Sequence, residues 1–145
     1  MNKQRIAKHS LILITTVFCI FLSLSAKTAD GASIRVINHF MTSGENVLHA
    51  KYTPMKSFSS QDVVVLLIGL QWDATQRSLG KHSLTWNWYS GNKLISTDTK
   101  TAELHNPPYK IWSRREAFSL GTGSFRAEVL LDGHFLAGNT FTIHS

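Results

Sequence analysis

The chain has 145 residues, with 15 Lys and Arg against 9 Asp and Glu and a single cysteine. This length matches one ordinary domain, and a formal net charge of +6 without basic clusters does not suit binding to nucleic acid. A lone cysteine excludes an intramolecular disulfide and a cluster of cysteine metal ligands.

Residues 1–26 have the pattern of a secretory signal peptide. Basic residues lead into the apolar run 11–24, and the small residues Ser25 and Ala26 follow it. The run is shorter than the ~20 residues that span a bilayer, so we expect a periplasmic or secreted protein with no stable membrane span after cleavage. Cleavage would remove three of the 15 basic residues, leaving 12 against 9 acidic ones, together with Cys19. The imperfect cleavage motif leaves open that the segment is retained as an N-terminal anchor.

The first half of the mature chain has β patterns. A polar, small-residue stretch at 27–33 predicts a flexible N-terminus, and Ile34–Phe40 predicts a strand. A turn signal follows at Thr42–Gly44, and Val47–Tyr52 predicts a second short strand. The run Val63–Leu70 has no polar side chain, and its three consecutive valines disfavour a helix. It predicts a central strand that is covered on both faces.

A hairpin is predicted in the middle of the chain, after a polar loop at 73–81. Ser83–Tyr89 alternates apolar and polar residues with a period of two, the turn Ser90-Gly91-Asn92 follows, and 93–101 returns as a strand. Trp86 and Trp88 share the apolar face of this strand, so we expect both in the core.

The last part of the chain predicts a second hairpin. Pro107-Pro108 excludes a central strand at 105–111, and 112–118 reads as a short strand or an irregular crossing. Phe125–Leu131 alternates with a period of two, and the strong turn Asp132-Gly133 leads into a return arm at 134–143 with a bulge expected at Gly138.

Together these elements predict an all-β protein. We expect a single antiparallel β-sandwich of about seven short strands over 34–145, behind the signal peptide at 1–26 and the flexible segment at 27–33.

Three segments also carry a family resemblance. They are the stretch 84–94, the pair Trp112-Ser113, and the stretch 123–136 with its Asp132-Gly133 turn. Together they resemble a small bacterial family of unknown function whose domain closes exported or membrane-tethered proteins. The resemblance covers the C-terminal half, and Phe125 stands where the family has a tryptophan. It implies a β-sandwich-like closing domain, and the family has no established catalytic site.

Four residues are candidates for ligand binding: Tyr109, Trp112, Arg114 and Arg115. They are predicted at strand ends or in loops, where an aromatic ring beside guanidinium groups can hold a sugar, a peptide carboxylate or an anionic glycan. The alternative is a tryptophan packed under a crossover loop, with two solvated arginines.

Metal binding and catalysis have weaker signals. A soft site for exported copper could use His39, Met41, His49 and Met55, since His39 and Met41 have a same-face spacing on a strand. The sequence has no Gly-x-Ser-x-Gly motif, no glycine-rich phosphate loop and no acidic pair spaced for glycoside hydrolysis. We therefore expect no enzymatic activity and no cofactor.

The leading hypothesis is an exported, non-enzymatic protein that acts by contact with an unknown protein or glycan partner in the cell envelope. One alternative is a periplasmic inhibitor or immunity protein that blocks the cleft of an enzyme. Another is a periplasmic metal carrier.

Overall fold

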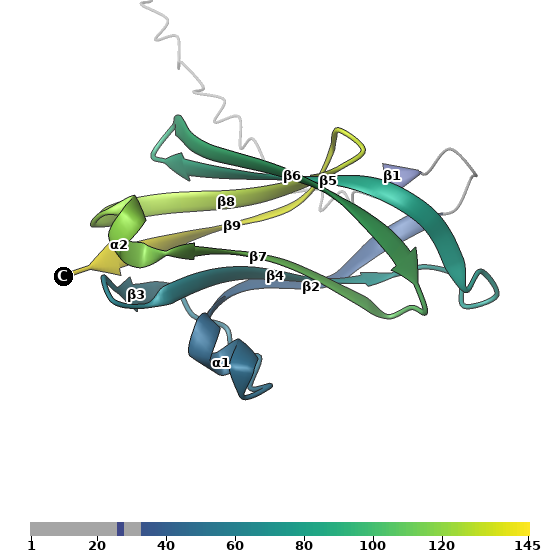
Figure 1. The fold of residues 1–145 in the computed structure, drawn as a ribbon, viewed down its shortest axis with the longest axis horizontal. Helices are drawn as coiled ribbons and strands as arrows, with labels where there is room; N and C mark the ends of the chain where they lie inside the picture. The colour runs from purple at the N-terminus through teal and green to yellow at the C-terminus, as the bar shows by residue number, and fades with distance from the viewer. Residues whose placement is uncertain (1–25, 28–32) are drawn as a thin grey trace, which may run out of the picture.

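The computed structural model describes residues 26–27 and 33–145, which form two β-sheets packed face to face (Figure 1). This arrangement confirms the predicted β-sandwich. The predicted signal peptide lies almost entirely outside the described residues, as does most of the segment 27–33. None of the described helices has the length and apolarity that a membrane crossing requires.

The first sheet has four strands in the order β1-β2-β4-β7, all antiparallel. These strands are β1 (Ala26–Lys27), β2 (Ser33–Ser43), β4 (Val63–Gln71) and β7 (Tyr109–Glu116). The second sheet has five strands in the order β3-β9-β8-β5-β6. These are β3 (Ser57–Ser59), β5 (Ser78–Ser90), β6 (Lys93–His105), β8 (Gly123–Leu131) and β9 (His134–His144).

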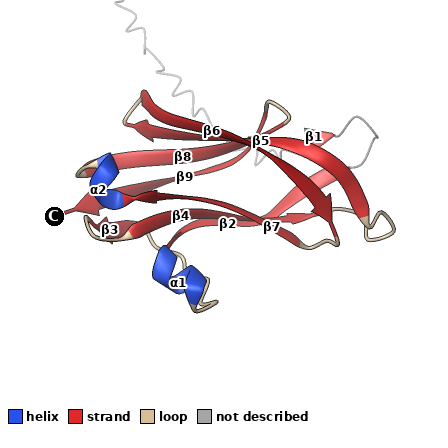
Figure 2. Cartoon of the chain, viewed as in Figure 1, coloured by secondary structure: helices blue, strands red, loops and turns tan. Residues whose placement is uncertain are grey.

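The strand count and pairing differ slightly from the prediction. Eight of the nine described strands have three or more residues, where the sequence predicted about seven. One pair, β3 with β9, is parallel. The described residues also form two short helices, α1 (Gly44–Leu48) and α2 (Ala117–Leu120), which are drawn in blue in Figure 2.

The core lies between the sheets and contains the predicted tryptophans. Trp86 and Trp88 on β5 are 2% and 1% exposed. Phe141 on β9 packs edge-on against Trp88, with ring centroids 6.1 Å apart. The inward alternation predicted for β8 is also confirmed, because alternate residues are buried: Phe125, Ala127, Val129 and Leu131.

The uninterrupted apolar run forms β4, which lies between β2 and β7 as the predicted central strand. Alternate residues such as Leu66 and Ile68 belong to the core between the sheets. Val65 and Leu67 belong to the opposite face and are buried as well. Both faces of β4 are therefore covered, which explains why the run needs no polar side chain.

The predicted strand at Val47–Tyr52 is wrong, because α1 occupies the start of this stretch and the rest is irregular. Ser43 caps the helix: its Oγ accepts a hydrogen bond from the Asn46 N–H at 3.2 Å. Gly44 allows the first residue of the helix to approach β4 closely, since a Cβ there would come within 2.8 Å of the Val63 Cβ. Val47 and Leu48 suggest a strand by composition, whereas the Ser43 cap before them favours the start of a helix.

Three boundaries also move. β5 begins at Ser78, so the loop predicted at 73–81 is shorter. The ambiguous stretch 112–118 is split between the end of β7 and the start of α2. The bulge predicted at Gly138 lies instead at Leu136, which has no partner in the register between β8 and β9. Gly138 has a different role, because a Cβ there would come within 3.0 Å of the Ala127 carbonyl oxygen.

Strands β6 and β7 form neighbouring edges of the two sheets. β6 is 13 residues long and pairs only with β5. Asp98 and Lys100 on β6 lie opposite Trp86 and Leu84 in the ladder, and therefore project from the inner face of the sheet. A register shift at Ile95 interrupts the same strand near its start.

Candidate functional site

The structure divides the four predicted ligand-binding residues between two faces of β7. Trp112 and Arg114 project from the outer face of the four-stranded sheet, and Trp112 is 49% exposed. Tyr109 and Arg115 belong to the inner side. Tyr109 packs against Trp72, with ring centroids 6.4 Å apart, and against His105 at 5.4 Å.

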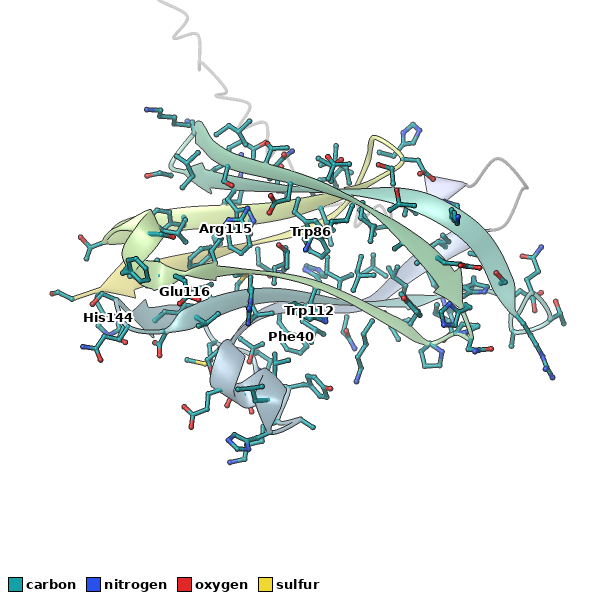
Figure 3. The ribbon with its side chains drawn as sticks, in the orientation of Figure 1. Phe40, Trp86, Trp112, Arg115, Glu116 and His144 are labelled. Atoms are coloured by element: carbon teal, nitrogen blue, oxygen red, sulfur yellow. The ribbon has the colours of Figure 1, made fainter. Side chains whose placement is uncertain are left out.

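Arg115 joins the two sheets. Its Nη2 donates to Ser96 Oγ at 2.8 Å and to the Asp98 carboxylate on β6. Its Nη1 donates to the main-chain carbonyl of Arg114 at 2.9 Å, and the guanidinium lies 5.5 Å from the Trp88 ring centroid. Figure 3 shows Arg115 between the sheets. These contacts engage both terminal nitrogens of the guanidinium within the fold, and ligand binding by Arg115 stays a prediction.

Trp112 and Arg114 instead form one wall of a groove that we call the α1–β7 groove. Its floor is Val63 and Val65 on β4, its second wall is α1, and its volume is about 330 Å³. The lining residues are Gly44, Glu45, Val47, Leu48, Val63, Val65, Trp112 and Arg114. Leu48 at the end of α1 is 85% exposed, so this large apolar side chain extends the apolar surface of the groove into solvent. The groove therefore offers an apolar surface that the described chain leaves open.

Backbone register and side-chain bonds place these walls. Phe40 on β2 pairs with Leu67, and Leu67 pairs with Trp112, so the three lie in one row across the sheet. Figure 3 shows Phe40 and Trp112 on the side of the sheet that carries α1. Asn46 fixes the helix to β2, because its Nδ2 lies 3.3 Å from Thr42 Oγ1.

The surroundings of the groove are mainly cationic. Lys110 lies two residues before Trp112 on β7, with its Nζ 3.9 Å from the ring centroid of Tyr52. Within residues 33–145, Arg114 forms no ion pair. Glu45 on α1 supplies a carboxylate at the opposite wall. A partner that carries an acidic group beside an apolar one would complement this edge.

The four predicted metal ligands have different surroundings, and no contact recorded among the described residues joins all four. The backbone N–H of Met55 donates to the Met41 carbonyl at 2.7 Å, and Met41 is buried in the core. His39 Nδ1 lies 2.9 Å from the side-chain nitrogen of Asn139, and His49 is an exposed residue at the end of α1. Across the part of the chain that the structure describes, no three His, Cys, Asp or Glu side chains cluster in a way that could hold a metal ion. Copper binding stays a prediction.

Sequence reasoning missed the α1 side of the groove. The predicted strand at Val47–Tyr52 includes Leu48, and an unbroken period of two in the predicted strand Ile34–Phe40 would place Phe40 on the same face as Ile34. The bulge in β2 between Val36 and Asn38 shifts the phase of the strand, so Phe40 falls on the outer face. The Ser43-Gly44-Glu45 sequence was the available signal, because a serine cap followed by an acidic residue favours a helix start.

A contact between His82 and Asp132, outside the groove, holds a turn in place. Both ring nitrogens of His82 on β5 face oxygen acceptors, with Nδ1 2.7 Å from Asp132 Oδ2 and Nε2 3.1 Å from the Leu79 carbonyl. Desolvation by itself would raise the pKa of Asp132. Hydrogen bonds from His82 and from the Ser83 N–H, with the charges of His82 and His134, instead lower that pKa below 3.8. The β8–β9 turn is thereby tied to β5.

Comparisons with known proteins identify the fold alone. No protein-family model and no curated protein matches the chain. An immunoglobulin-like protein of Pseudomonas aeruginosa has a similar structure, with 11% identity, a TM-score of 0.51 and coverage of 77% of this chain and 96% of that one. The Pseudomonas fluorescens alkylpurine DNA glycosylase AlkC, bound to DNA containing an abasic site analog, also has a TM-score of 0.51 and 11% identity. That match covers 80% of this chain, which spans only 32% of the glycosylase chain. The resemblance to a small bacterial family stays a prediction.

Proposed function

We propose that this chain is an exported, non-enzymatic β-sandwich that binds a protein partner in the cell envelope through the α1–β7 groove. The observation that carries the proposal is the exposed apolar surface of this groove, with Leu48 and Trp112 at its walls. Contiguous apolar surface of this kind marks interaction sites, and a half-exposed tryptophan is a common interface hot spot. The signal-peptide pattern in residues 1–26 supports export to the periplasm or beyond.

The lining of the groove indicates the chemistry of the partner. The partly exposed Val63 provides an apolar floor above the buried Val65, which suits a leucine-sized or aromatic side chain of the partner. Arg114 can then donate to a carboxylate next to that side chain, and Lys110 adds a second positive charge on the same face of β7. The partner surface is therefore apolar at its centre and acidic at its rim.

One further observation favours a role as an inhibitor or immunity protein. α1 projects from the outer side of the four-stranded sheet instead of lying flat on it (Figures 1 and 2). It carries the exposed Leu48 at its far end. A projecting helix with an apolar tip has the shape needed to enter the cleft of an enzyme.

Affinity capture with matched variants tests this function. The wild-type protein should capture one stoichiometric envelope protein, and Leu48→Asp and Trp112→Ala should each abolish that capture. Leu94→Ala is the matched control, since Leu94 is 49% exposed but lies at the start of β6 in the other sheet. Equal capture by the Leu48→Asp variant, or no stoichiometric partner for the wild-type protein, would overturn the proposal.

A further inference from the structure

The outer face of the five-stranded sheet carries a second hollow that the proposed function does not use. It has a volume of about 600 Å³ and lies over β8 and β9, beside the β5–β6 turn. A smaller hollow of about 300 Å³ adjoins it along the same two strands. Arg126 and Thr140 line both hollows, so the two form one groove that follows the strands. We call it the β8–β9 groove.

Arg126 is held in a fixed position at the middle of this groove. Its guanidinium carbon lies 4.3 Å from the ring centroid of Tyr89, and its Nε lies 3.2 Å from Glu128 Oε1. The Nε atom is buried, whereas the side chain as a whole is 39% exposed, so the accessible part includes the terminal nitrogens. A stacked guanidinium loses little conformational freedom when it pairs with a ligand carboxylate.

The rest of the lining combines apolar surface, with Phe125 and Phe141, and hydroxyl and amide groups, a mixture that suits sugar ligands. Lys56 adds a second cation at one end of the groove. Between and around the cations lie the hydroxyls of Ser124 and Thr140 and the amide of Asn92. One carboxylate, that of Glu128, also lines the groove and pairs with Arg126, so Lys56 keeps the net charge of the lining positive. Phe135, which is 45% exposed, lies at the other end and offers an apolar ring face. Hydroxyls and amides match sugar hydroxyls, and the open ring can pack against the apolar face of a sugar.

From this lining we infer that the β8–β9 groove binds an acidic glycan strand, with Arg126 and Lys56 on its carboxylates. An elongated groove that runs along two paired strands suits a linear chain of sugar units better than a compact ligand. The charges of Arg126 and Lys56 favour an acidic strand over a neutral one, because the hydroxyl and amide groups of the lining alone would accept either. This site lies on the opposite sheet from the α1–β7 groove and does not depend on it.

Titration calorimetry on the purified full-length protein tests the inference with three acidic oligosaccharide probes: hexagalacturonate, hexamannuronate and a hyaluronan hexamer. At least one should bind with a Kd below about 1 mM. The matched neutral control for each acidic probe is its own methyl ester. Each acidic probe that binds should have a Kd at least tenfold lower than that of its methyl ester. If none of the three acidic probes binds below about 1 mM, or the binding probe and its methyl ester bind equally, the inference is wrong. Inorganic phosphate that binds as tightly as the oligosaccharide would reduce the site to a general anion site and also overturn it.

Charge-removing variants locate the binding. Arg126→Gln and Lys56→Gln should each raise the Kd for the acidic oligosaccharide at least fivefold. If Arg126→Gln fails to fold because the stack on Tyr89 is lost, Lys56→Gln still decides the test. Lys100→Gln is the control for net charge, because Lys100 is an exposed lysine on β6, away from the groove. Equal weakening by Lys100→Gln would indicate unspecific charge attraction, and unchanged binding by Lys56→Gln would exclude this groove. Leu48→Asp should leave oligosaccharide binding unaffected.

Discussion

Replacing Arg115 by methionine tests whether this arginine holds the two sheets together. Methionine keeps much of the side-chain length and its apolar stem but removes the guanidinium. The substitution removes the hydrogen bonds to Ser96 and Asp98 on β6 and the contact with the Trp88 ring. Arg114→Met, one residue earlier, is the matched control because Arg114 projects from the outer face of the same strand.

The expected cost follows from the surroundings of each group. A hydrogen bond that involves a charged group contributes about 1.5–3 kcal/mol when it is buried, and about 0.2–1 kcal/mol is typical of exposed ion pairs. The Arg115 side chain is 22% exposed and that of Asp98 is 39% exposed, so water can partly replace the lost contacts. The contact with Trp88 adds about 0.5–1 kcal/mol. We therefore expect Arg115→Met to lower the free energy of unfolding by about 1.5–2.5 kcal/mol and Arg114→Met by less than about 0.5 kcal/mol.

Urea unfolding followed by tryptophan fluorescence measures both variants. A double-mutant cycle with Asp98→Asn should give a coupling energy of about 0.5–1 kcal/mol between Arg115 and Asp98. If Arg115→Met is no more destabilising than Arg114→Met, or if the coupling energy is zero, the sheet-bridging role of Arg115 is refuted.

Three further predictions concern the core, the β8–β9 turn and the groove. Trp86→Ala should lower the free energy of unfolding by about 3–5 kcal/mol, measured in urea, and a variant of unchanged stability would contradict its place in the core. Because the pKa of Asp132 is lowered in the folded state, its stabilising effect is complete above the ordinary value of 3.8 and is lost as the pH falls through the folded value. The urea midpoint of Asp132→Asn should therefore be lower than that of the wild type at pH 7, and the difference should shrink towards pH 2. A difference that is constant with pH would argue against the lowered pKa of Asp132 and the contacts with His82 and Ser83 that lower it. Gly44→Ala should cost about 1–3 kcal/mol, since its Cβ would lie 2.8 Å from the Val63 Cβ, and unfolding at the wild-type urea midpoint would show that α1 adjusts freely.

The sequence predicted those parts of the fold that depend on alternation within one strand. The apolar faces of β5 and β8 and the valine-rich β4 follow from local patterns, because a sandwich core imposes a period of two on each strand. α1 was missed because five residues are too few to show a helical period. The bulge was predicted at Gly138 because a glycine inside a strand often marks a bulge. In the structure this glycine instead allows a close approach to the backbone of Ala127.

The candidate site was only half predictable for a related reason. Arg114 and Arg115 are neighbours in the sequence and were treated as one cationic pair, yet consecutive residues of a strand project to opposite faces. Once 109–116 is recognised as one strand, Trp112 and Arg114 separate from Tyr109 and Arg115. The second wall of the groove depends on Gly44 lying against Val63, a contact across 19 positions of the chain that no local pattern reveals.

The inward-facing charges of β6 bear on how molecules of this protein behave when they are crowded together. A 13-residue edge strand with one free row of backbone groups is a template on which fibrils can grow. A strand from a second molecule that paired with β6 would press against Asp98 and Lys100 and strip water from both, and the irregularity at Ile95 would break its register. A protein at high local concentration gains from such an edge, because a long edge strand that resists pairing does not recruit neighbouring copies.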